Sequence, residues 1–177
     1  MTIEKRFQTM ELRANGRRLE GYAALFGIEA RIGGGLIETI APGAFAATLA
    51  ERSDILALVD HDPSRVLART RSGTLRLSED TRGLAFDMDV PDTQAGRDVL
   101  TLAERGDLGG MSFGFSARDD NVQGNRRELR TVDLYEISIV SAFPAYDGTE
   151  IHARAKSDGC PTRDRAARTL QILELLS

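Results

Sequence analysis

Three residues of this 177-residue chain have side chains suited to nucleophilic catalysis, and each lies in a predominantly apolar stretch. They are His61, which is one of only two histidines, Ser112, which follows two glycines, and Glu136. The stretches that contain them are residues 54–62, 109–116 and 133–140. In a Ser-His-acid site the histidine takes the proton of the hydroxyl and the acid orients the histidine. We therefore treat these three residues as candidate catalytic groups.

The apolar composition of the three stretches predicts that each candidate projects from a β-strand. Side chains alternate between the two faces of a strand. Ser112 should therefore share a face with Gly114, and Glu136 should share a face with Ser138. His61 is expected at the end of its strand, just before Pro63. Rigid strands suit a site that needs accurate placement of its groups.

Taken singly, each candidate also has a purely structural explanation, and two other kinds of site were considered. Zinc is disfavoured because Asp60, His61 and Asp62 would point alternately to opposite faces of a strand, and His152 and Cys160 are the only other soft ligands. A glycosidase is disfavoured because the chain has no Trp to stack on a sugar, only seven Phe and three Tyr. We expect neither a metal nor a cofactor.

Composition and charge limit the class of protein. The length predicts one main domain with a substantial core. A net charge of −4 provides no basic surface of the kind that binds nucleic acid. With a single cysteine, Cys160, no internal disulfide can form, which favours a reducing cytoplasm. The first residues contain no apolar run typical of a signal peptide, and no segment has the ~20 apolar residues that span a bilayer. We expect a protein without membrane segments.

Most of the chain reads as short strands with two or three helices. Asn15-Gly16 predicts a tight hairpin. Pro42 suits the first turn of a short helix that extends to Leu49. A second helix is expected to begin at a cap formed by Asp92 or Thr93 and to end at Gly106. The polar segment 118–127 is predicted to be a loop. An antiparallel, barrel-like β domain with peripheral helices is the simplest fold.

The composition changes near residue 155. Residues 156–162 read as a linker, and Leu170, Leu173 and Leu176 predict one apolar face of a terminal helix. We therefore expect a main domain at 1–155, followed by a linker and amphipathic tail at 156–177.

The candidates and their surroundings together resemble the prohead serine proteases of tailed bacteriophages, which are distantly similar to herpesvirus assemblin. The segments that carry the resemblance are 19–27, 38–45, 60–62, 110–115, 134–140 and 144–146. Ser112 follows His61 by 51 residues and Glu136 follows Ser112 by 24, close to the family's order and spacing. The resemblance covers roughly residues 3–155.

The resemblance implies an assemblin-like antiparallel β-barrel with surrounding helices. It implies a serine endopeptidase that cleaves scaffolding protein, or a scaffold-like extension of the major capsid protein, and that also cleaves itself. It further implies a homo-oligomer, a dimer or larger, that acts in the cytoplasm of the bacterial host inside the immature capsid. Neither nucleic acid nor membrane is an expected partner.

Three questions stay open at the level of sequence. The herpesvirus enzymes use a second histidine as third catalytic member, so His152 competes with Glu136 for that role. Backbone amides near Gly109-Gly110 or in the turn 143–145 are the candidates for an oxyanion hole. A non-catalytic capsid-assembly or scaffolding protein of the same architecture is the alternative function.

Overall fold

The structure is a computed structural model that describes residues 3–8, 13–51 and 54–141. The strands are β1 (Glu4–Gln8), β2 (Arg13–Asn15), β3 (Arg18–Leu25), β4 (Ala30–Ile32), β5 (Leu36–Ile40), β6 (Leu56–Val59), β7 (Asp62–Arg69), β8 (Leu75–Glu79), β9 (Gly83–Asp89), β10 (Gly110–Gln123) and β11 (Arg126–Val140). The helices are α1 (Ala46–Ala50) and α2 (Gln94–Arg105), with a 3₁₀ turn at Gly33–Gly35. The prediction of a mainly β protein with peripheral helices is confirmed.

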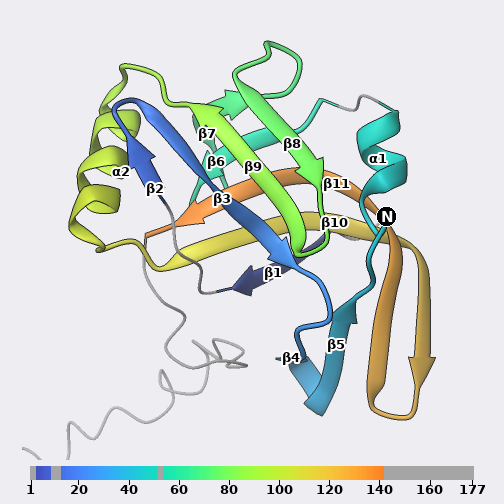
Figure 1. The fold of residues 1–177 in the computed structure, drawn as a ribbon. Coiled ribbons are helices and arrows are strands. Elements are labelled where there is room, and N and C mark those ends of the chain that lie inside the picture. Colours follow the sequence, from blue (N-terminus) through green and yellow to red (C-terminus); the bar gives the residue numbers. More distant parts are fainter. Residues whose placement is uncertain (1–2, 9–12, 52–53, 142–177) are drawn as a thin grey trace, which may run out of the picture.

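The strands form two sheets that lie one in front of the other in Figure 1. The four-stranded sheet has the order β2-β3-β9-β8, and all its pairs are antiparallel. The seven-stranded sheet has the path β1-β10-β11-β5-β4, and β6 pairs with both β11 and β7. Because β11 runs parallel to β5 and β6, the larger sheet is mixed rather than wholly antiparallel as expected. The pairings among the described residues define two sheets, and their closure into a barrel remains a prediction.

The core contains the inward-facing side chains of both sheets. Leu19, Phe86 and Met88 come from the smaller sheet, whereas Phe113 and Ile137 come from the larger one. Side chains alternate between the two faces of a strand. Ser112, next to Phe113, and Glu136, next to Ile137, therefore point to the other face of the larger sheet. The candidates of β10 and β11 therefore project away from the core.

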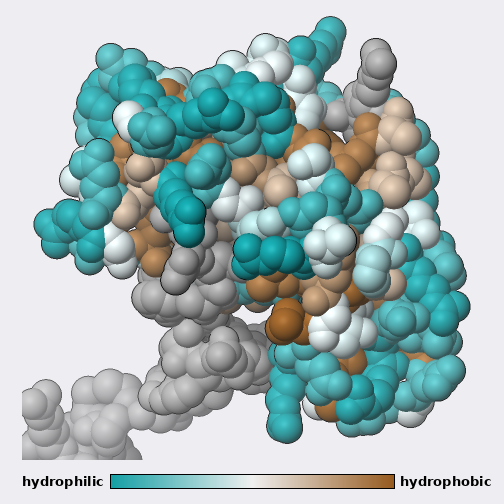
Figure 2. All heavy atoms as spheres, viewed as in Figure 1, coloured by the Kyte–Doolittle hydropathy of each residue, from teal (hydrophilic) through white to brown (hydrophobic). Residues whose placement is uncertain are grey.

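The smaller sheet presents a charged outer surface. Arg18 and Arg76 both pair with Asp87, and Arg76 also reaches Asp89. Figure 2 shows largely hydrophilic residues on this side of the molecule. Exposed ion pairs of this kind contribute little to stability, so their main effect is to keep this face of the sheet hydrophilic. No helix among the described residues is long and apolar enough to cross a membrane.

The segment 118–127 is not a loop, and this prediction was wrong. β10 and β11 continue through it as one long hairpin whose register extends to the pair Gln123 and Arg126. The turn contains only Gly124 and Asn125, and Gly124 supplies a φ of 61°. The polar residues here are stabilised by cross-strand contacts such as the 2.6 Å ion pair of Arg127 and Asp120. Such pairing overrides a polar composition.

A buried carboxylate connects three strands of the larger sheet. Glu38 of β5 is only 2 % exposed, and Arg6 of β1 reaches both of its oxygens, at 2.5 and 2.9 Å. Arg127 of β11 donates to it at 3.1 Å. A buried charge is tolerated only when it is well paired. The cluster therefore fixes the short N-terminal strand β1 against the body of the sheet, alongside β10.

The predicted helix signals are correct for α2 and only partly correct for α1. Thr93 caps α2, since its hydroxyl accepts from the Gly96 N–H at 3.2 Å, and Gly106 ends it with a φ of 73°. The first helix begins at Ala46 rather than at Pro42. Pro42 lies in a turn before it, in which the Ala44 N–H donates to the carbonyl of Ala41.

Candidate active site

The pairing of β10 with β11 brings two of the three candidates onto neighbouring strands. Ser112 lies opposite Ser138, and Gly114 lies opposite Glu136. The Cα atoms of such directly opposed residues are about 4.5–5.5 Å apart. Ser112 and Ser138 are buried, 2 % and 0 % exposed, and Glu136 is 8 % exposed. The prediction that Ser112 and Glu136 project from strands is correct.

His61 lies in a turn, so the prediction that it is a strand residue was wrong. β6 ends at Val59 and β7 begins at Asp62, and these two residues pair with each other. Asp60 and His61 form the two-residue turn between them with φ values of 51° and 60°. Two consecutive positive φ angles are typical of a type I′ hairpin turn. Pro63 does not break the segment, because it belongs to β7.

The turn places His61 in contact with Glu136. The Nδ1 atom of His61 lies 2.6 Å from Oε1 of Glu136, although the two residues are 75 positions apart. The second carboxylate oxygen, Oε2, accepts a hydrogen bond of 3.2 Å from the hydroxyl of Ser138. Both oxygens of Glu136 therefore have partners, and its carboxylate is held in one orientation.

The electrostatics of Glu136 favour its charged form. Burial by itself raises the pKa of this carboxyl. The hydrogen bond and charge of His61 and the smaller effects of Ser138 and Lys5 lower it, and the pKa lies below its usual value. Glu136 is therefore ionised at neutral pH and can only accept hydrogen bonds. It follows that Nδ1 of His61 carries the proton and that Nε2 is the ring nitrogen available as a base.

Ser112 lies beside this pair without a bond to it. Within the described residues its hydroxyl makes no hydrogen bond to His61, and the structure joins His61, Glu136 and Ser138. Ser112 is two residues along β10 from Gly114, which faces Glu136, and two residues span about 6.6 Å along a strand. Nucleophile and base are often further apart in unliganded enzymes than in their substrate complexes.

Gly114 provides the space that the Glu136 side chain occupies. A Cβ atom at position 114 would lie 2.7 Å from Oε1 of Glu136 and 2.8 Å from its Cγ. These distances are shorter than van der Waals contact. A side chain larger than glycine at position 114 would therefore displace the Glu136 carboxylate, and the reason is steric rather than a special φ angle.

We expect Gly114→Ala to lower any His61-dependent cleavage by roughly 10- to 100-fold, because the added methyl displaces the carboxylate from His61. The measurement is kcat on a peptide substrate together with circular dichroism. The control is the double variant Gly114→Ala with Glu136→Gln. If both changes act on the same contact, this variant should be little worse than Glu136→Gln alone. Additive losses would contradict the explanation.

Sequence reasoning missed the contribution of Gly114 and Ser138 to the site. Alternation placed Gly114 and Ser138 on the correct faces, but it carried no signal that the two strands were neighbours. His152, Cys160 and the turn 143–145 lie outside the described residues. Gly109 is a poor oxyanion donor, because its N–H already donates to the carbonyl of Val140 at 2.9 Å.

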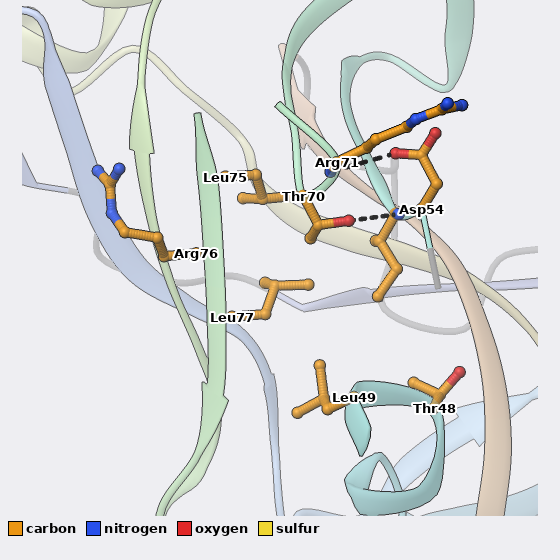
Figure 3. A pocket seen from close by; sticks show the side chains of 9 residues that line it. Thr48, Leu49, Asp54, Thr70, Arg71, Leu75, Arg76 and Leu77 are labelled. Carbon is orange, nitrogen blue, oxygen red and sulfur yellow. Dashed lines mark hydrogen bonds between the residues drawn. The ribbon is translucent and has the colours of Figure 1, made fainter. Parts of the chain in front are cut away.

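A cavity of about 620 Å³ lies at the other end of β6 (Figure 3). Its lining includes Leu49 of α1 and Leu77 of β8, and none of the three candidates contributes to it. Two hydrogen bonds join residues that line it. The Ile55 N–H donates to the hydroxyl of Thr70 at 2.8 Å, and the Arg71 N–H donates to Asp54 at 3.4 Å. The cavity is therefore separate from the candidate site.

A histidine hydrogen-bonded to a buried carboxylate is also found in serine hydrolases, and here the carboxylate lies on the strand that pairs with the strand of Ser112. The model of the caudovirus prohead serine protease family matches residues 5–161, which is most of the chain. This chain belongs to that family, and it is a serine protease of phage capsid maturation. No curated protein and no solved structure matched it.

Proposed function

We propose that this protein is a serine endopeptidase with Ser112 as nucleophile, His61 as general base and Glu136 as the acid that orients His61. The observation that carries the assignment is the 2.6 Å contact of His61 Nδ1 with Glu136, a residue paired with the strand of Ser112. Its substrate would be scaffolding protein, or a scaffold-like extension of the major capsid protein. The site of action would be inside the immature capsid in the host cytoplasm, with the protease as a homo-oligomer.

The proposed mechanism uses Nε2 of His61 as the base, because Nδ1 is already bonded to Glu136. Nε2 of His61 takes the proton of the Ser112 hydroxyl while Oγ attacks the scissile carbonyl carbon and forms a tetrahedral oxyanion. Collapse of this intermediate breaks the C–N bond, and His61 returns the proton to the leaving amine. Water then attacks the acyl-enzyme with His61 again as base, and Ser112 is released together with the new carboxylate. Glu136 stabilises the imidazolium at both stages.

Ser138 supports the acid rather than the nucleophile in this scheme. Its hydroxyl donates to the Glu136 oxygen that His61 does not use. This bond stabilises the ionised carboxylate and restricts its rotation. The catalytic hydroxyl is assigned to Ser112 on the order and spacing of the family motif.

Coexpression with the neighbouring capsid or scaffold gene tests the proposal. Intact-mass analysis should show a truncated substrate with the wild type and a full-length one with Ser112→Ala. A serine-directed fluorophosphonate should label the wild type at Ser112 and leave Ser112→Ala unlabelled. A protein that neither cleaves nor labels would instead fit a non-catalytic scaffolding role.

We also expect the chain to cleave itself slowly between about Ala153 and Thr162. These residues lie outside the described part of the structure, and their small and polar composition is typical of exposed, protease-sensitive linkers. The expected products are the domain 1–155 and the tail, within a few residues. Intact mass followed over days at high protein concentration measures this. A wild type that stays identical in length to Ser112→Ala would contradict it.

A further inference from the structure

The turn that carries His61 has a left-handed backbone conformation without a glycine. Asp60 and His61 both have positive φ angles, and neither is glycine. The two-residue turns of the β2–β3 and β10–β11 hairpins differ, since each places a glycine, Gly16 or Gly124, at its positive φ. Such angles cost free energy in residues other than glycine, less so in Asp and His than in most, and contacts with the surrounding structure offset that cost.

The carboxylate of Asp60 supplies that support. Its Oδ1 accepts a 2.8 Å hydrogen bond from the backbone N–H of Ser141. Its Oδ2 accepts from the Ser141 hydroxyl at 2.8 Å and from Arg65 at 3.1 Å. The backbone N–H of Asp60 donates to the carbonyl of Ile139 at 2.9 Å. Asp60 is therefore joined through both main chain and side chain to the end of β11.

The strand to which Asp60 is joined also carries Glu136. The β6–β11 register extends from the pair Leu56 and Glu136 to the pair Val59 and Ile139, and Asp60 continues it by its bonds to Ile139 and Ser141. His61 is the next residue. Fixing Asp60 on β11 thus fixes the distance from the His61 backbone to the Glu136 carboxylate.

We propose that Asp60 is a positioning residue for the catalytic base, and this inference rests on the function proposed above. Asp60 touches no reacting atom, since its bonds go to Ser141, Arg65 and Ile139. It holds the left-handed turn on β11 so that Nδ1 of His61 meets Glu136 and Nε2 stays available as the base. Loss of the carboxylate frees the turn and lets the imidazole leave this orientation.

Asp60→Gly is the decisive variant, because glycine accepts the positive φ without strain and lacks the carboxylate. We expect kcat on a peptide substrate to fall on the order of 10- to 100-fold, with KM within about twofold of wild type. Asp60→Asn keeps the acceptor for the Ser141 N–H and tolerates the left-handed region, so it should recover most of the lost kcat. Arg65→Ala is the matched control, since it removes only an exposed ion pair and should stay near wild type.

A second readout reports the position of His61 without any substrate. The Nδ1 proton shared with Glu136 should give a strongly downfield proton NMR resonance in wild type, in Asp60→Asn and in Arg65→Ala. It should be lost in Asp60→Gly and in Glu136→Gln. Ser141→Ala removes the hydroxyl bond to Asp60 and keeps the backbone bond, so the downfield resonance should be weakened rather than lost. This milder variant serves if Asp60→Gly fails to fold.

The outcomes separate this inference from the proposed function. Wild-type kcat and an intact resonance in Asp60→Gly, with Ser112→Ala inactive, would overturn the role of Asp60 and leave the protease assignment standing. A wild type that neither cleaves nor labels would instead remove the proposed function. Even then the resonance in Asp60→Gly would decide whether Asp60 positions His61.

Discussion

Replacement of Ser112 by alanine is expected to reduce peptide-bond cleavage on the order of 10⁴-fold or more while the fold stays intact. Without the hydroxyl no acyl-enzyme can form, and His61 has no proton to take. Loss of His61 itself, in His61→Ala, should have an effect of similar size. Residues that act as one unit lose nearly all their benefit when any one is removed, so the double variant should be no worse than either single one.

The structure predicts that the Ser112 variant folds. Ser112 is 2 % exposed between β1 and β11, opposite Phe7 and Ser138, and alanine fits in the space that serine occupies. Its hydroxyl makes no hydrogen bond to His61 that would be lost. Circular dichroism and thermal unfolding should match wild type. Ser116→Ala is a matched control, because Ser116 is another buried serine of β10 and its hydroxyl bonds to Tyr135 rather than to His61 or Glu136.

Cleavage of the capsid or scaffold substrate by a correctly folded Ser112→Ala protein would overturn the serine-protease assignment for this residue. Activity should be measured by intact mass of the substrate, because mass identifies the cleaved bond. The Ser116→Ala control should remain close to wild type.

The second large effect is expected at the third member of the site. Glu136→Gln should lower kcat on the order of 10³-fold, less than loss of Ser112, since nucleophile and base remain. A neutral amide cannot stabilise the imidazolium. It can also present its N–H₂ group to Nδ1, which would favour the tautomer with the proton on the wrong nitrogen.

His152→Ala is the matched comparison for Glu136→Gln, because His152 is the other candidate third member. We expect it to behave nearly as wild type, since the carboxylate of Glu136 already occupies Nδ1 of His61. Parallel measurements of kcat and fluorophosphonate labelling would show which residue supports His61. Should the two variants behave in the opposite way, the third member is His152, and the protease assignment itself stands.

The candidate residues could be singled out from the sequence because histidine is rare in this chain and because all three lie in apolar stretches. Only two histidines exist, and Ser112 and Glu136 each lie in a stretch whose alternation fixed their faces correctly. The caps of α2, Thr93 and Gly106, were equally predictable, since each depends on chemistry within a few residues. Sequence patterns such as alternation and helix caps were reliable where the structure depends on residues close together in the sequence.

The polar hairpin 118–127 and the turn at His61 could not be predicted in the same way. The hairpin extends because the pairing of the apolar parts of β10 and β11 continues into it and satisfies its backbone, as between Asn121 and Glu128. The turn bends back because Asp60 binds Ser141, 81 residues further along the chain. Neither interaction leaves a periodic pattern in its own segment.

The sequence by itself determined the mainly β class, the helix caps and the identity of the three candidate groups. The tertiary structure decided which of them meet: the pairing of β6 and β11 brings His61 to Glu136 at 2.6 Å, and Gly114 leaves room for the carboxylate. The physical reason is the range of the interactions involved. Propensity and alternation depend on neighbours in sequence, whereas the register at this site depends on pairs such as Gly114 with Glu136, 22 positions apart, and Leu56 with Glu136, 80 positions apart.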